Sequence, residues 1–366
     1  MAKTLEELFG YVPLLKALRQ PVNGVPMPEG LQTLMTLTND EPIGDQGAYP
    51  ILKGTGRTAK FTPKGAPHRE RSNQDIQKKP VRLVNASNKF RIPQSVYVRL
   101  SQINAYASDP MGQQYVEYYS QQHRTELDNL VTISLVSVLS RGVINVSADG
   151  SPLPSSVGEA WKVDFEMDAG HQGQLDVFGT GNLINVLWSD VNAPIAQQIK
   201  SIRDAGLKES GLPITTCYYG RNVFQYIMDN NRLAPLAQNP AYYAGFQAGE
   251  IPSGFLGLKW VPINSAFFQT DAGVTIDMWD EDLAVFTPDP NREWFELLRG
   301  QSVIPSGVLG QIFNSGPAAN EGVMLERGMY QYALRNHDPV TLDIYYGYCW
   351  LPCLTNPKAI FQATVA

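Results

Sequence analysis

The chain has 366 residues, of which 43% are hydrophobic and only 17% charged, and its net charge is −6. This length and hydrophobic content suffice for one large core or two modest ones, and they exclude a globally disordered protein. The 31 Gly, 26 Pro, 17 Tyr and 14 Phe favour sheets, turns and long ordered connections over a helical bundle. We therefore expect a mixed α+β fold.

Compartment and redox state follow from what the sequence lacks. No apolar run approaches the roughly 18 residues that suggest a membrane span, and the first fifteen residues carry acids where a secretory signal carries bases. We expect synthesis in the cytoplasm and no membrane partner. Cys217, Cys349 and Cys353 are too few and too unevenly spaced for a disulfide framework or a zinc site, so we expect small buried residues.

The N-terminal fifty residues resemble an arm more than a domain. Residues 2–20 carry a capping-box spacing and one apolar helical stripe, which predicts a short amphipathic helix interrupted near Pro13. From residue 21 to residue 50, prolines and glycines punctuate the chain, which is typical of extended backbone with little secondary structure of its own.

The next segment is strongly basic. Residues 53–99 hold twelve Lys or Arg against two acids, a net charge of +10 that leaves −16 for the rest of the chain. The pattern around this segment predicts a two-stranded extension over residues 51–100, whose arms are joined by a loop. Phosphate binding could explain the charge, but interleaved aromatic residues are few, so pairing with an acidic protein surface explains it at least as well.

The clearest predicted element is a long helix. Asp109 is an N-cap candidate, Pro110 suits the first helical position, and no break follows until Gly142 after Arg141. The 32 residues of Pro110–Arg141 would span roughly 48 Å at 1.5 Å per residue. Its first half is rich in Tyr and Gln, whereas its second half places Leu and Val at spacings of three and four, which predicts one apolar face.

A compact unit of strands and helices follows the long helix. Residues 160–167 alternate as a strand, and a helix is predicted to start at Asn192, with Pro194 in its first turn, and to end near Gly206 or Gly211. A strand over 212–220 and a helix over 221–233 come next, then short strands and turns from 234 to 304. The C-terminal stretch predicts two strands across an Asn-Pro turn.

Motifs that carry catalysis or cofactor binding are missing. Two GTG stretches, at 54–56 and 179–181, lack the third glycine of a dinucleotide loop, and the four histidines stand at least 48 residues apart without metal-ligand neighbours. The acidic cluster of Asp277, Asp280, Glu281 and Asp282 would suit a glycosidase, but exposed acids also protect edge strands. We therefore expect no enzyme, no cofactor and no metal.

Three stretches, taken in order, resemble one family. They are "GRTAKFTP" with its basic continuation, "LWSDVNAPIAQQIKSIRDAG" followed by "YYGRNVFQYIMDNNRL", and "RNHDPVTLDIYYGYCWLPCLTNPKAIFQATV". Together they span most of residues 45–366, and the series is similar to the lambda-type, or protein E, major capsid proteins of tailed phages. The resemblance implies the Hong Kong 97-type capsid fold.

The resemblance also divides the chain into segments with different expected roles. These are an N-arm (1–45), an extended loop (46–102), a peripheral domain (103–190), an axial domain (191–319), and the C-terminal strands of the peripheral domain (320–366). The spine helix of the peripheral domain would be residues 110–141.

The implied function is an icosahedral head built from hexamers and pentamers of this chain around double-stranded DNA that is held without sequence specificity. Implied partners are a separate scaffolding protein, a portal and a decoration protein, with assembly in the host cytoplasm and a final location in the virion. The expected contact residues between subunits are Lys60, Lys64, Arg69, Arg71, Lys78 and Lys79 on the extended loop, and Asp280, Glu281 and Asp282 on the acidic cluster. Two alternatives stay open: an encapsulin-like shell around a protein cargo, and a carbohydrate-active hydrolase that uses the 277–282 acids.

Overall fold

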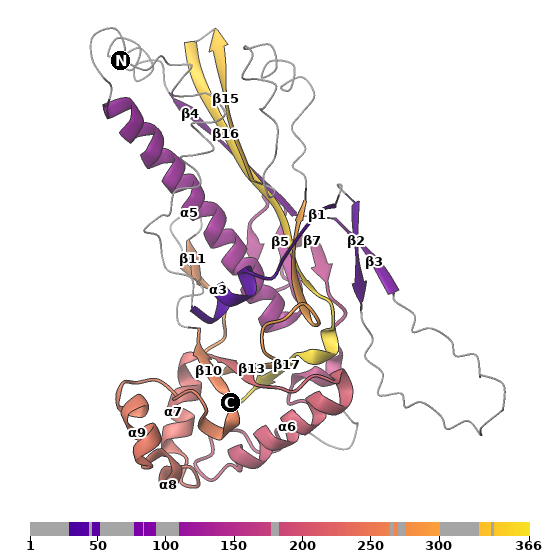
Figure 1. Ribbon diagram of the computed structural model, residues 1–366, viewed down its shortest axis with the longest axis vertical. Coiled ribbons are helices and arrows are strands. Elements are labelled where there is room, and N and C mark those ends of the chain that lie inside the picture. The colour runs from indigo at the N-terminus through magenta and orange to yellow at the C-terminus, as the bar shows by residue number, and fades with distance from the viewer. Residues whose placement is uncertain are drawn as a thin grey trace, which may run out of the picture.

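The computed structural model of the protein describes residues 29–43, 46–51, 77–82, 84–92, 110–176, 183–263, 267–269, 275–300, 329–337 and 340–366. Within these ranges the fold mixes helix and sheet, as predicted, in an elongated molecule with two differently built ends (Figure 1). No helix in this part of the chain combines the length and apolar content of a membrane span.

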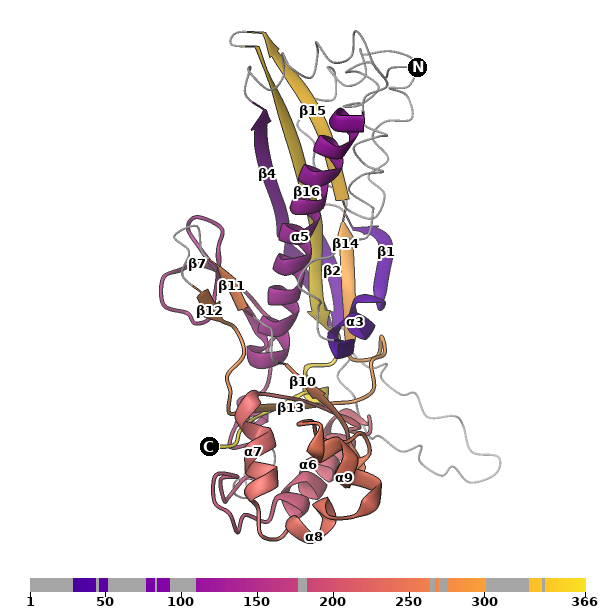
Figure 2. The same cartoon turned by 90° about the vertical axis from the view of Figure 1, so that its left-hand side faces the viewer.

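One end is built on the long helix and a long sheet. Helix α5 (Pro110–Arg141) has the predicted bounds, and Gly142 follows it. It packs against β16 (Val340–Leu354), the central strand of a sheet (Figure 2). Antiparallel partners of β16 are β4 (Val84–Ile92) along one edge, and β15 (Met329–His337) and β14 (Phe295–Gly300) along the other.

The other end holds a second sheet covered by short helices. Its strand order is β10 (Lys259–Pro262), β9 (Thr216–Tyr219), β13 (Leu283–Thr287), β17 (Phe361–Thr364) and β8 (Gln172–Gly173). Helices α6 (Ile195–Ser210), α7 (Arg221–Asp229), α8 (Ala234–Ala237) and α9 (Pro240–Gln247) gather here (Figure 1). Because η5 (Pro357–Ala359) leads from β16 directly into β17, the C-terminal segment belongs to both sheets.

Small elements complete the described fold. A three-stranded sheet joins β5 (Val143–Ser147) with β6 (Pro152–Leu153) and β7 (Glu159–Asp164), and β11 (Phe267–Gln269) pairs with β12 (Thr275–Asp277). Single turns of 3₁₀ helix lie at η1 (Ala169–His171) and η2 (Phe255–Gly257). The predicted strand over 160–167 is thus β7, and the two predicted C-terminal strands are β16 and β17.

The end of α5 is more deeply enclosed than the sequence predicted. Every residue from 133 to 140 is buried, including Ser134 and Ser137, whose hydroxyls donate to the Leu130 and Ile133 carbonyls (2.8 and 2.9 Å). The expected single apolar face is therefore wrong for this stretch. Strands from both sheets surround the helix here, so its serines are accommodated by bonding within the helix.

Residues 29–43 form regular structure, contrary to the expectation of extended backbone. Helix α3 (Glu29–Met35) buries Leu31 and Leu34 completely, and β1 (Thr38–Ile43) pairs in parallel with β14. The strand β2 (Gln46–Ile51) follows and pairs with β3 (Gln77–Arg82). A paired extension exists, but its described strands are 46–51 and 77–82, whereas residues 84–92 of the predicted 51–100 extension lie in the large sheet as β4, opposite residues 342–350.

Two local predictions were wrong in the helical unit. The helix expected to start at Asn192 begins at Ile195, because the Asn192 N–H donates to Asp190 Oδ1 (2.8 Å) in a preceding turn. Its last residue is Ser210 and its C-cap is Gly211, one of the two predicted ends, whose φ of 75° is the left-handed conformation that glycine adopts readily. Helices α8 and α9 occupy part of the range predicted as strands and turns. The Asn239 side chain caps α9 by accepting from the Ala241 N–H (3.0 Å).

Candidate functional site

The acidic cluster forms the turn between β12 and β13, directly beside the start of α7. Within the turn, Asp280 Oδ1 accepts a hydrogen bond from the Asp282 N–H at 3.0 Å. Asp277, Asp280 and Glu281 are exposed, and Asp282 is half-buried. The sequence expectation of a solvated acidic turn is therefore confirmed for three of the four acids.

Two of these acids hold α7 in place. Glu281 forms an ion pair with Arg221, and Asp282 accepts from Asn222 Nδ2 at 2.9 Å and from the Tyr226 hydroxyl at 2.7 Å. The hydrogen bond to Asp282 is the largest cause that raises the pKa of Tyr226 to about 12. Asp282 therefore acts as an anchor for the first two turns of the helix.

Gly220 permits this close approach. A Cβ at this position would lie within 3.0 Å of the carbonyl oxygens of Asp280 and Glu281, a separation that Cβ atoms in proteins essentially never show. Its N–H donates to the Leu283 carbonyl at 2.9 Å, and the Asn222 N–H donates to the Glu281 carbonyl at 3.1 Å. The start of α7 and the acidic turn are thus joined through backbone as well as side chains.

The same turn is connected to the end of the long helix. Arg141, the last residue of α5, donates from Nη2 to the Met278 carbonyl at 3.0 Å and from Nη1 to the Leu153 carbonyl at 3.4 Å. Burial lowers the pKa of the Arg141 guanidinium, and the nearby charge of Asp280 opposes this effect. The acidic turn is therefore held between the two ends of the molecule.

The basic candidates lie elsewhere. Lys60, Lys64, Arg69 and Arg71 fall outside the described residues, and Lys78 and Lys79 lie in β3, opposite Pro50 and Tyr49 of β2. Strands β2 and β3 project from the side of the molecule, well away from α7 (Figure 1). Within one chain, the fold therefore does not bring Lys78 and Lys79 to the acidic turn.

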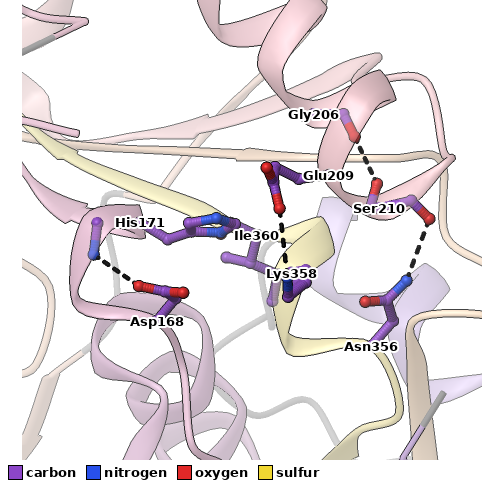
Figure 3. Close-up of polar contacts among 9 residues, drawn as sticks. Asp168, His171, Gly206, Glu209, Ser210, Asn356, Lys358 and Ile360 are labelled. Atoms are coloured by element: carbon purple, nitrogen blue, oxygen red, sulfur yellow. Dashed lines mark hydrogen bonds and ion pairs between the residues drawn. The ribbon is translucent and has the colours of Figure 1, made fainter. Parts of the chain in front are cut away.

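A partly buried polar cluster lies where the two ends join (Figure 3). His171 Nδ1 lies 3.1 Å from the Ile360 carbonyl oxygen, and its ring stacks on Phe361 at 4.3 Å. Burial is the main cause that lowers the pKa of His171.

The neighbouring polar groups of this cluster are bonded separately. Lys358 pairs with Glu209 at 3.3 Å, the Ser210 hydroxyl donates to the Gly206 carbonyl at 2.7 Å, and Asp168 accepts from the Gly170 N–H at 3.0 Å. Although His, Ser and Asp occur together here, each of these bonds is local or joins secondary-structure elements. The cluster is therefore a structural joint between η1, α6 and η5.

The sequence analysis missed this joint, because the joint depends on contacts between residues far apart in the chain. It treated the histidines as isolated, yet His123 and His171 are both buried and both stack on aromatic rings. Cys217, Cys349 and Cys353 are buried, as predicted. No group of three potential metal ligands occurs in the ranges that the structure covers.

Comparison with known families decides which kind of protein carries these features. The family model of phage major capsid protein E matches residues 48–365. The chain belongs to the phage major capsid protein E family.

Solved structures agree with this membership at the level of the fold. A capsid protein of a prophage in E. coli CFT073 is 12% identical with a TM-score of 0.50, and the match covers 100% of this chain and 94% of the other. A phage-related protein from Bordetella bronchiseptica RB50 is 10% identical with the same TM-score, and the match covers 98% of each chain. No curated protein sequence matches this chain significantly.

For a member of the phage major capsid protein E family, the functional site is the surface through which copies of the chain form the shell. The protein is thus a bacteriophage capsid protein, and the fold is the capsid fold that the sequence resemblance implied. Neither the encapsulin-like shell nor the carbohydrate-active hydrolase is favoured by this membership.

Proposed function

We propose that this chain is the major capsid protein of a tailed bacteriophage with double-stranded DNA, and that its hexamers and pentamers build the icosahedral head. The family match over residues 48–365 carries the proposal. The segments then serve as an N-arm (1–45), an extended loop (46–102), an axial domain (191–319) and a peripheral domain made of the two remaining segments. The long helix α5 supports the peripheral domain, and the helical end supports the axial domain.

The extended loop of one subunit binds an acidic surface of a neighbouring subunit in this proposal. The loop residues are Lys60, Lys64, Arg69, Arg71, Lys78 and Lys79, and the acids are Asp280, Glu281 and Asp282. Separation of β3 from α7 within one chain supports a contact between copies (Figure 1). One exposed ion pair contributes only about 0–1 kcal/mol, so summed contact area must supply most of the binding free energy.

The proposed function needs no catalysis and no cofactor. Glu281 and Asp282 bind side chains of α7, and these contacts support a structural rather than a catalytic role for both acids. Further proposed partners are a scaffolding protein, a portal, a decoration protein and packaged DNA, with assembly in the host cytoplasm. Because most of the chain outside the basic segment is acidic, an acidic inner wall would hold DNA without adsorbing it strongly.

Charge reversal tests the loop contact. We expect the variant with Lys60, Lys64, Arg69 and Arg71 replaced by Glu to remain folded but to form no closed shells, because like charges would then face each other across the contact. Negative-stain electron microscopy and light scattering of the purified protein, with scaffold supplied, would measure this.

A matched control is the Asp280→Asn, Glu281→Gln variant, which removes charge without reversing it. It should form shells with altered efficiency, because the buried contact area, rather than single ion pairs, supplies most of the binding free energy. Shells like the wild type from the charge-reversed variant would disprove the role of the loop. A wild-type protein that stays monomeric would contradict the assembly itself.

A further inference from the structure

The first half of α5 meets the large sheet at a buried imidazole, beside the stack of Tyr119 on Phe90. His123 is 3% exposed and lies flat on the Tyr346 ring of β16, with ring centroids 3.8 Å apart and planes 5° apart. Phe90 of β4 also lies beside the imidazole, with the centroids of the two rings 5.9 Å apart. Helix and sheet therefore meet at an aromatic layer centred on His123.

The surroundings of this imidazole disfavour a positive charge on it. Its Nδ1 atom is buried and lacks a hydrogen-bond partner, and burial alone lowers the pKa of His123 to about 4 from an ordinary value near 6.5. Neutral His123 packs well against Tyr346, whereas the imidazolium would remain desolvated in the same position.

Charged groups on the surrounding elements are already paired with one another. On β4 and β16, Lys89 and Arg91 bind Asp343 at 3.2 and 2.8 Å. On α5, Arg124 binds Asp128 at 2.8 Å.

The remaining titratable neighbours are aromatic or belong to α5. Tyr119 of α5 stacks on Phe90, and Tyr345 and Tyr348 lie on β16 beside Tyr346. Strand β15 places Gln331, which does not titrate, opposite Tyr346. Glu126 of α5 is the carboxylate on the same side of the helix as His123.

Glu126 joins α5 to β16 through its carboxylate. It is exposed and accepts a hydrogen bond from the Tyr346 hydroxyl, which ties α5 to β16. It also lies three residues after His123, a spacing at which side chains on a helix meet. An imidazolium at His123 would therefore compete with Tyr346 for the same carboxylate.

We propose that protonation of His123 acts as an acid switch that draws Glu126 away from Tyr346 and releases the first half of α5 from the β4–β16 face. The second half stays attached, because residues 133–140 are buried on all sides and Arg141 and Gln362 bond its end to other elements. The switch changes the attachment of one half-helix while both sheets remain folded.

The size of the effect follows from proton linkage. The released helix exposes His123 with a pKa near 6.5, whereas the attached helix holds it near 4. Acid thus favours release, and the opening equilibrium constant should rise about 20-fold between pH 7 and pH 5.

Hydrogen exchange of the purified full-length protein at the two pH values, corrected for intrinsic exchange, measures this constant. We expect amides of residues 119–126 to show the 20-fold rise, with those of residues 133–140 nearly unchanged. His123→Phe keeps a ring in the stack but cannot bind a proton, so its response should vanish. Glu126→Gln should weaken the response.

His171→Phe is the matched control, since it removes another buried imidazole, and it should keep the wild-type response. Unchanged exchange of residues 119–126 in the wild type would overturn the proposal without any variant. It would also be overturned by a wild-type response in His123→Phe or by a lost response in His171→Phe.

Discussion

Gly220 shows how one missing side chain positions a helix. Its backbone lies against the carbonyls of Asp280 and Glu281, so the acidic turn can approach α7 closely enough for Asp282 to reach Asn222 and Tyr226. Since the φ of Gly220 is −79°, the constraint is the approach of the two segments and not the backbone conformation.

Gly220→Ala should therefore destabilise the subunit. The added methyl group would collide with two backbone oxygens that cannot turn aside, and overpacking of this kind costs about 1–3 kcal/mol in the free energy of unfolding. Denaturant unfolding of the unassembled subunit would measure the loss.

Gly158→Asn is a suitable control for this change. Its φ of 81° is a conformation that Asn tolerates, and no atom lies near the position of a Cβ, so its effect should stay within about 0.5 kcal/mol. Equal losses in the two variants would contradict the steric argument.

Among the elements, the end of α5 depends most on partners from elsewhere. The last carbonyls of a helix have no backbone N–H donor within the helix itself. For α5, Gln362 of β17 donates from Nε2 to the Leu139 carbonyl at 2.8 Å, in a buried position. The C-terminal strand thus completes the hydrogen bonding of a helix more than 200 residues earlier.

Replacement of Gln362 by Met tests this bond. Met has a similar size but no donor, so the Leu139 carbonyl would stay buried without this partner, at a cost of about 1–3 kcal/mol. The melting temperature of the subunit should fall accordingly. Gln197→Met on the exposed face of α6 is the matched control and should leave it nearly unchanged.

At the scale of the whole molecule, the separation of charge matters most. The basic segment and the acidic remainder belong to one chain, and the proposed contact lets them meet between copies. Exposed charges are screened beyond about 10 Å at 0.1 M salt and beyond about 3 Å at 1 M. Assembly that depends on this attraction must therefore respond to salt.

We expect shell formation to be slower in about 1 M sodium chloride than in about 0.1 M, because screening weakens the long-range attraction between subunits. Time-resolved light scattering would follow the rate at a fixed protein concentration. A rate that rose with salt would show instead that apolar contacts control assembly.

The sequence by itself determined the features whose signals lie within short stretches of chain. Pro110 and Gly142 mark the ends of α5, alternation marks β7, and the Asn-Pro turn separates β16 from β17. The acidic turn and the buried cysteines were also predictable, since composition and local pattern fix a residue's solvent preference. Capping and periodicity act over a few residues, so one sequence suffices to read them.

Only the tertiary structure decided how those elements are joined. It placed β4 beside β16 rather than in the extension, enclosed residues 133–140 on all sides, and set Tyr346 against Glu126 from 220 residues away. It also gave His123 and His171 their aromatic partners. These contacts depend on which distant surfaces exclude water together, and no local pattern in the sequence encodes that choice.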